Sequence, residues 1–294
     1  MRKVVDLPRP TIGEQIREID FALGDYPQYT DILNFHKAIL EILMPTGDFP
    51  TKGAREALSD EAVKDLKERA VSSKKPIRSF LDASIFDEDN IMSTASDIVE
   101  CLMHSRPGGE TLEGLLKALE HGEVDARATI GAILGEDASC FQQLGDMFGV
   151  EPALLLFIFE TPLRPFFEDI ARRVEEELIE TWWEPFCPVC GRTSPVARVR
   201  QRKRYMTCTY CGAEYLVDLF LCVYCGNKDP HSLGFIAFEE HPEYELDYCE
   251  KCNHYIKVIY EERRPKKIPR GLEDLLTREL DVLAKGYELG QSRT

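Results

Sequence analysis

The stretch CPVCGRTSPVARVRQRKRYMTCTYCG, residues 187–212, contains two C-x-x-C pairs separated by seventeen residues. A second unit of the same kind follows, in which CVYC at 222–225 and CEKC at 249–252 are separated by twenty-three residues. This spacing is typical of a four-cysteine ribbon, in which a β-hairpin brings two tight turns together around one tetrahedral metal ion. The sequence therefore predicts two metal sites with four thiolates each.

The residue that follows each pair supports this interpretation. It is Gly191, Gly212, Gly226 or Asn253, and Gly and Asn are the residues that best tolerate the left-handed backbone such a turn often needs. A redox dithiol is the alternative, but a thioredoxin-like C-x-x-C begins a helix in a βαβ unit. These pairs lie among short β-like segments, which favours metal binding.

Consecutive pairing of the four C-x-x-C units defines the expected ligands, although an interleaved pairing of the first unit with the third and the second with the fourth stays open. Four thiolates suit zinc and iron alike. Each chain is thus expected to hold two metal ions, iron or zinc. The expected ligands are Cys187, Cys190, Cys208 and Cys211 for one ion, and Cys222, Cys225, Cys249 and Cys252 for the other.

Length and composition indicate a folded protein of the reducing cytoplasm. The chain has 294 residues, is 44% hydrophobic and carries ten cysteines, eight of them in the C-x-x-C pairs. No apolar run approaches the roughly 18 residues that a membrane span requires, and the basic N-terminal stretch lacks the apolar segment of a signal peptide. In a reducing compartment, thiols serve as metal ligands more often than as disulfides.

Residues 1–182 have the periodicity of helices. Thr11 and Glu14 form a predicted capping box, and Ser59 is a predicted N-cap. Residues 152–183 are apolar on nearly every side before Pro162, which predicts one long central helix that buries Leu155 and Phe157. Further amphipathic stretches are at about 12–23, 30–44, 92–104, 111–121, 124–134 and 137–148.

The fold class is therefore predicted as α+β. An N-terminal all-α helical bundle precedes two small rubredoxin-like or zinc-ribbon β modules, and a C-terminal helix closes the chain. Short β-like runs separated by Gly, Pro, Asn and Asp predict the strands of the modules. The predicted domains are residues 1–182, 183–217, 218–264 and 265–294, the last comprising a linker and the C-terminal helix.

Charge is distributed unevenly along the chain. The net charge is −16, and residues 1–182 alone carry 19 Lys and Arg against 35 Asp and Glu. Such a surface repels phosphate backbones, so nucleic acid is an unfavoured partner. The cations of the first ribbon are expected on a solvent-facing strand, where they offset the thiolate charge. The alternative is phosphate contact, with Tyr205, Tyr210 and Tyr215 stacking on bases. These cations are Arg192, Arg198, Arg200, Arg202, Lys203 and Arg204.

The remaining chemistry-bearing residues give no sign of an enzyme. Cys101 and Cys140 lie in helical patterns and are expected to be small buried hydrophobes. The sequence has no nucleophile paired with a base, no H-E-x-x-H and no dinucleotide fingerprint. Three histidines near the ribbons are expected to have surface or hairpin roles; they are His231, His241 and His254.

The order of these motifs resembles the formate dehydrogenase accessory protein family, FdhE. The resemblance is carried by CPVCGRTSPVARV, RYMTCTYCGAEY, CVYCG, LDYCEKCNHYIKVIYEE and LEDLLTRELDVLAKGYELG, in that order. The fourth pair leads into a strand with Tyr255, Ile256 and Lys257, as in that family. The closing helix is similar to the family's in Asp274, Leu275, Leu280, Asp281, Gly286 and Tyr287.

This resemblance implies a cytoplasmic accessory protein rather than an enzyme. It implies two rubredoxin-like modules, iron as the associated metal, and a role in maturation through binding the catalytic subunit of a formate dehydrogenase. The partner surface is expected to include Arg200, Arg202 and Arg204. A zinc-ribbon nucleic-acid binder and a rubredoxin-like electron carrier are the alternatives, and a homodimer stays open.

Overall fold

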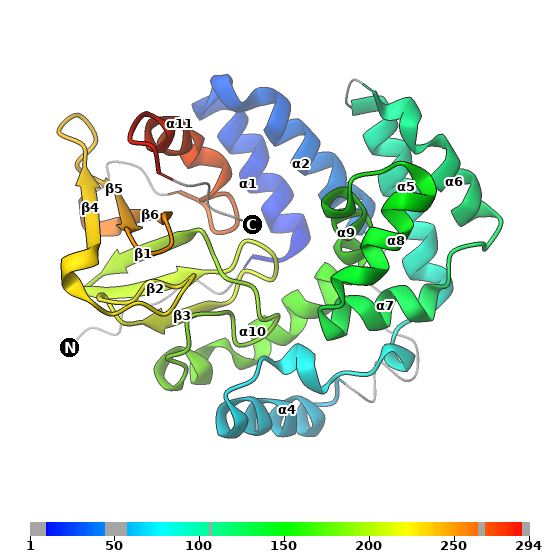
Figure 1. Cartoon of the computed structure of the whole chain (residues 1–294), viewed down its shortest axis with the longest axis horizontal. Coiled ribbons are helices and arrows are strands. Elements are labelled where there is room, and N and C mark those ends of the chain that lie inside the picture. The colour runs from blue at the N-terminus through cyan, green and yellow to red at the C-terminus, as the bar shows by residue number, and fades with distance from the viewer. Residues whose placement is uncertain (1–9, 45–57, 106–107, 264–267, 290–294) are drawn as a thin grey trace.

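The computed structural model describes residues 10–44, 58–105, 108–263 and 268–289 (Figure 1). A helical region comes first, a β-sheet with both cysteine units follows, and a short helix closes the described chain. The predicted α+β class with this order of elements is confirmed. The N-terminal stretch 1–9 and residues 264–267 of the predicted linker lie outside the described residues.

The helices begin where the sequence places their caps. Thr11 and Glu14 form a capping box in which Thr11 N donates to Glu14 Oε2 at 2.8 Å, and Ser59 Oγ accepts from Ala62 N at 3.2 Å. Within the described ranges, no helix is both long and apolar enough to cross a membrane. The helices are α1 (Ile12–Asp25), α2 (Thr30–Leu43), α4 (Asp60–Ser73), α5 (Glu88–Ser105), α6 (Glu113–Glu120), α7 (Ala126–Gly135), α8 (Ala138–Phe148), α9 (Pro152–Glu160), α10 (Arg164–Thr181) and α11 (Arg278–Gly286).

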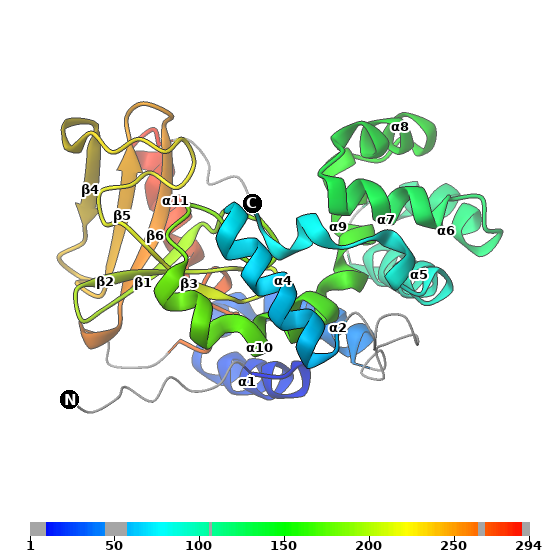
Figure 2. The ribbon, with the colours of Figure 1, turned by 90° about the horizontal axis from the view of Figure 1, so that it is seen from below.

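The prediction of one long helix over 152–183 is wrong. A 3₁₀ turn, Thr161–Leu163, separates α9 from α10 at Pro162, whose ring cannot continue an α-helical hydrogen-bond ladder. Leu155 is buried as expected, whereas Phe157 is partly exposed on the outer side of α9. The break lets α9 pack among α5, α7 and α8 while α10 runs toward the sheet (Figure 2).

The strands of both cysteine units form one six-stranded sheet, in the order β3-β2-β1-β6-β5-β4. Each unit contributes three antiparallel strands, and the first strand of unit one pairs in parallel with the third strand of unit two. The second unit therefore repeats the first by translation along the sheet. The strands are β1 (Val196–Arg200), β2 (Lys203–Thr207), β3 (Glu214–Val217), β4 (Leu233–Ala237), β5 (Tyr244–Cys249) and β6 (His254–Tyr260).

The main hydrophobic core extends from the helices into the first cysteine unit. Phe167 of α10 packs on Tyr210 with ring centroids 5.8 Å apart, and Trp182, Cys187 and Met206 are buried in the same cluster. All four residues of β3, beside α10, are buried. The boundary at 182/183 stays a prediction about independent folding units, and it falls within one continuous core.

The C-terminal helix α11 packs on the second unit. Leu280 and Ala284 form a small core with Leu246 of β5 and Tyr255 of β6. The fully buried Lys257 of β6 donates to Asp281 Oδ2 at 2.8 Å and lies 2.5 Å from Asp274 Oδ1. Two carboxylates around one buried ammonium thus connect the C-terminal segment to the sheet.

Candidate metal centres

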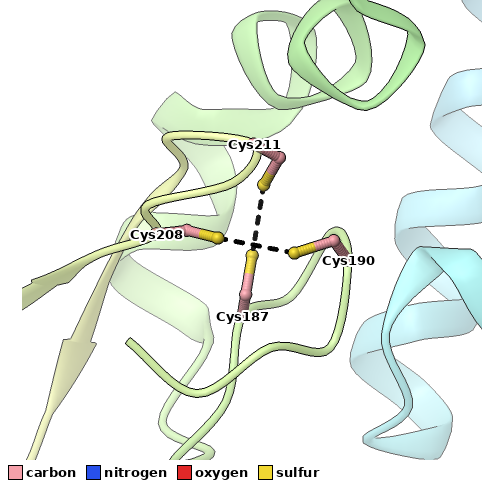
Figure 3. Close-up of side chains that lie close together, drawn as sticks. All are labelled: Cys187, Cys190, Cys208 and Cys211. Carbon is pink, nitrogen blue, oxygen red and sulfur yellow. Dashed lines mark hydrogen bonds between the residues drawn. The ribbon is translucent and has the colours of Figure 1, made fainter. Parts of the chain in front are cut away.

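Four cysteines of the first unit converge in the main core (Figure 3). The Sγ atoms of Cys187 and Cys211 are 3.4 Å apart, as are those of Cys190 and Cys208. All four side chains are buried. The structure therefore brings the first C-x-x-C together with the second.

The second unit forms a similar but more open group. The Sγ atoms of Cys222 and Cys252 are 3.6 Å apart, and those of Cys225 and Cys249 are 3.7 Å apart. Cys225 is exposed and Cys252 is partly exposed. The third pair thus meets the fourth, and the interleaved pairing is not the one found.

The four turns share one backbone design. The N–H of Gly191 donates to Cys187 O, and the same bond recurs from Gly212, Gly226 and Asn253 at 2.8–2.9 Å. All four residues have φ between 57° and 79°, so the expected left-handed backbone after each pair is confirmed. The glycine or asparagine lets the chain turn back so that both sulfurs of a pair point the same way.

The spacing of the sulfurs fits a tetrahedral metal ion. Within each group, all four Sγ atoms lie within 4.8 Å of one another. Zinc–sulfur bonds of about 2.3 Å in a tetrahedron place neighbouring sulfurs about 3.8 Å apart. The 3.4–3.7 Å separations of the close pairs are near that value, so each group can hold one ion.

Because the first group is buried, its cysteines need a bound cation to carry the negative charge of thiolates. Burial raises the pKa of the Cys187 and Cys211 thiols well above the usual value, because thiolates lose their hydration in the core, whereas hydrogen bonds from the neighbouring cysteines lower the pKa of Cys208. A divalent ion has the opposite effect to burial and deprotonates a coordinating thiol. The buried cluster is therefore suited to a bound cation.

The first group is also attached to the helical region through its backbone. The N–H groups of Ile77 and Arg78 donate to the carbonyls of Pro188 and Val189 at 2.8 and 2.9 Å. From the other turn, Tyr210 Oη donates to Glu160 O at 2.7 Å. Both turns of the first group thus contact helical residues directly.

The basic residues of the first ribbon do not lie along a solvent-facing strand, and that expectation is wrong. Arg198 is 2% exposed and donates to Glu273 and Glu261. Arg204 is equally buried and donates to Asp247 at 3.1 Å and to the Leu221 carbonyl at 2.7 Å. These arginines stabilise the protein interior, so they are not available to a partner.

Arg200 and Arg192 are engaged as well. Arg200 donates to Glu214 at 3.0 Å and lies over the ring of Tyr205, while Arg192 forms an ion pair with Glu160. Only Arg202 and Lys203 of the six cations are exposed. The expected partner surface at Arg200, Arg202 and Arg204 is therefore not formed by free cations.

The aromatic and histidine candidates also differ from a nucleic-acid site. The three tyrosines proposed to stack on bases, Tyr205, Tyr210 and Tyr215, are buried. None of the three ribbon histidines joins a sulfur group in the described chain: His231 and His241 are exposed, and His254 packs on Tyr224 at 4.7 Å. Cys101 and Cys140 are partly rather than fully buried.

Sequence reasoning missed the acidic partners that hold these arginines. Glu160, Glu214 and Glu273 are each almost completely buried, and they lie 32, 14 and 75 residues from Arg192, Arg200 and Arg198. Glu160 lies in a run that reads as an apolar helix. The one available signal was that an ionisable residue in such a run must find a buried partner.

Fold and site together define a class of protein in which a helical region adjoins a sheet built from two tandem four-cysteine ribbon units. The crystal structure of the FdhE protein from Pseudomonas aeruginosa has this fold. It matches 97% of this chain and 96% of that chain with a TM-score of 0.58 at 16% sequence identity. That likeness shows a shared fold.

Curated relatives carry the same name. A protein FdhE homolog from Aquifex aeolicus is 31% identical over 142 residues, which are 47% of this chain and 50% of the relative. Those from Enterobacter sp. and Escherichia coli K12 are 32% and 30% identical over 102 residues, or 32% of each relative. The matches thus span about half of the first relative's length and a third of the others'. No family model matches the chain. The similarity to FdhE inferred from the cysteine motifs is confirmed.

Proposed function

We propose that this protein is a formate dehydrogenase accessory protein that binds the catalytic subunit and serves its maturation in the cytoplasm. The observation that supports this most is the likeness to an FdhE fold over 97% of the chain. The FdhE homologues found by sequence add to it. We propose no catalytic role for the chain itself.

The eight paired cysteines are proposed to hold two metal ions, iron or zinc. The support is the grouping of their sulfurs at tetrahedral spacing and the turn backbone that aims each pair. Metal analysis after anaerobic, reducing purification, together with the absorption spectrum, distinguishes the two metals. Recovery of fewer than two ions per chain from such a preparation would count against this part of the proposal.

The surface proposed to meet the catalytic subunit is an exposed apolar patch made of Leu219, Phe220 and Phe235. Phe220 and Phe235 are 61% and 65% exposed, and all three residues line a pocket of about 200 Å³ beside β4. Apolar patches of this kind are typical of protein-binding surfaces. The patch replaces the basic residues as the proposed contact.

The test is capture of a formate dehydrogenase catalytic subunit co-expressed with the tagged chain. We expect wild type to retain the subunit and the double variant Phe220→Asp, Phe235→Asp to lose most of it while both metal ions stay bound. Phe21→Asp is the matched control, since Phe21 is a 75% exposed phenylalanine on α1. Equal loss in the control would refute the placement of the surface.

The same preparation tests the two alternatives. A chain that fails to capture the subunit but shows a reversible one-electron couple would be an electron carrier. A chain that fails to capture it but binds single strands with an affinity that falls steeply with salt would be a nucleic-acid binder. The buried arginines and tyrosines of the first ribbon give that last alternative no support.

A further inference from the structure

A cavity of about 350 Å³ lies where α2 and α9, which adjoin in Figure 1, meet the first cysteine unit and the C-terminal segment. Its volume is within the range of about 300–1,000 Å³ that is usual for small-molecule sites. One wall is apolar and consists of Phe35, Ile39, Leu156 and Phe157. Thr209 and Tyr210 of the first unit's second turn also line the cavity, which shares no lining residue with the second sulfur group or with the apolar patch on the second unit.

Two guanidinium groups also line the cavity. Arg164 donates from Nε to Glu168 at 2.8 Å and from Nη2 to Gln15 at 2.9 Å. Arg192 forms an ion pair with Glu160 and lies 4.5 Å from the Tyr210 ring centroid. A guanidinium has five N–H donors, so these contacts leave donors of both arginines for a further acceptor.

His36 lies in the same lining, and its bonding is incomplete. Its Nε2 atom is buried and has no hydrogen-bond partner within the part of the chain that the structure describes. Burial and the nearby Arg164 lower the pKa of His36 to about 3, so the imidazole is neutral in a positive field. A buried polar atom without a partner costs stability, and a ligand that accepts its hydrogen bond removes that cost.

The acidic residues in the lining do not oppose an anion there. Glu160 is matched by Arg192 and lies 3.8 Å from Arg78. Asp274 is held by Lys257 at 2.5 Å. Arg164, Arg192 and His36 therefore offer N–H donors that their contacts within the described chain do not use, beside the apolar residues of the lining.

We propose that this cavity binds a small organic anion, with a carboxylate at the polar end and an apolar body against the phenylalanines. The carboxylate accepts from the guanidinium donors and from the Nε2–H of His36, in the neutral tautomer that carries its proton on Nε2. This inference goes beyond the proposed function, because it rests on the cavity and needs no partner protein.

The test compares benzoate with benzamide, its neutral isostere, as probes of the full-length chain by ligand-observed NMR and calorimetry. We expect saturable binding of benzoate and at least roughly tenfold weaker binding of benzamide, since a charge-assisted bond is lost. Equal binding of the two would overturn the anion assignment. Absence of saturable benzoate binding up to roughly 10 mM would overturn the site itself.

Two variants distinguish a binding role from a structural one. His36→Leu keeps the side-chain size but removes the unpartnered polar atom, so it should raise the melting temperature of the free protein and weaken benzoate binding at least roughly tenfold. Lower stability of this variant together with unchanged binding would contradict the assigned role of His36.

The second variant blocks the cavity without touching its charges. Ala153 is an exposed lining residue, so Ala153→Trp should abolish benzoate binding with little change in stability, and Ala153→Ser should retain it. Benzoate that binds equally to both variants occupies another place on the chain, and the proposal then fails.

Discussion

Replacing Arg198 by Met should destabilise the protein strongly. Arg198 is buried, and both its Nε and its Nη2 donate to Glu273 Oε1, at 3.0 and 2.6 Å. Although burial opposes the charged form, Glu273 raises the pKa of Arg198, so the guanidinium stays charged. Removal of the guanidinium leaves Glu273 as a buried carboxylate with its charge uncompensated, which costs about 3–5 kcal/mol.

Urea unfolding followed by tryptophan fluorescence and circular dichroism measures this loss. In a chain of this size it corresponds to a decrease of about 6–20 °C in melting temperature. Arg202→Met is the matched control, because Arg202 is exposed at the tip of the same hairpin and should change stability by no more than about 0.5 kcal/mol.

A second substitution tests the cause. Glu273→Gln in the Arg198→Met background removes the unpaired charge, while Gly271 N can still donate to the side chain as it does now at 2.6 Å. The double variant should therefore recover at least about half of the lost free energy of unfolding. A loss of less than about 1 kcal/mol in the single variant, or no recovery in the double, would refute the reasoning.

Three further expectations concern the metals, the helical core and pH. Cys190→Ser and Cys225→Ser should each lower the metal content from two ions to one by elemental analysis. Only Cys190→Ser should also lower the melting temperature of the helices, because only the first group lies in the main core. Loss of both ions from either variant would contradict separate sites. Leu155→Asp should lower the free energy of unfolding by about 3–5 kcal/mol in a denaturant titration. Phe157→Asp, on the exposed side of α9, should lower it by at most about 1 kcal/mol. Equal losses would contradict the assigned orientation of α9. Burial and the neighbouring Asp247 raise the pKa of Glu245 to about 7, so its contribution to stability is complete below about pH 4.5 and is lost as pH rises through 7. Glu245→Gln should therefore remove about 1–2 kcal/mol of the decrease in unfolding free energy between pH 5 and 8, and an unchanged pH profile would exclude this carboxyl as its source.

The features that the sequence predicted correctly depend on neighbours in the chain. The capping box needs only Thr11 and Glu14, and the left-handed turn after each C-x-x-C needs only a glycine or asparagine. The strands of the second unit follow from β-like runs between turn residues. The pairing of consecutive cysteine units also follows from one hairpin per unit.

The features that were missed depend on residues far apart in sequence. The parallel pairing of β1 with β6 merges the two units into one sheet, and no local pattern indicates it. The basic residues of the first ribbon were expected on a solvent-facing strand. That prediction was wrong because Arg198 and Arg204 bind carboxylates 75 and 43 residues away. Charge periodicity shows which residues share a face of a strand, and only the tertiary fold shows whether that face meets solvent.

When a sheet is formed by translating one unit, its two edge strands come from different positions of the unit and are unlike. The two surfaces of a heterologous contact between subunits differ in the same way. Here β3 is buried along its length beside α10, whereas β4 is an edge strand whose residues are all partly or fully exposed. One end of the sheet can accept a strand from another chain, but the other cannot offer a complementary edge. Copies of this protein therefore cannot polymerise head to tail through their sheets, although Phe235 lies exposed on the open edge.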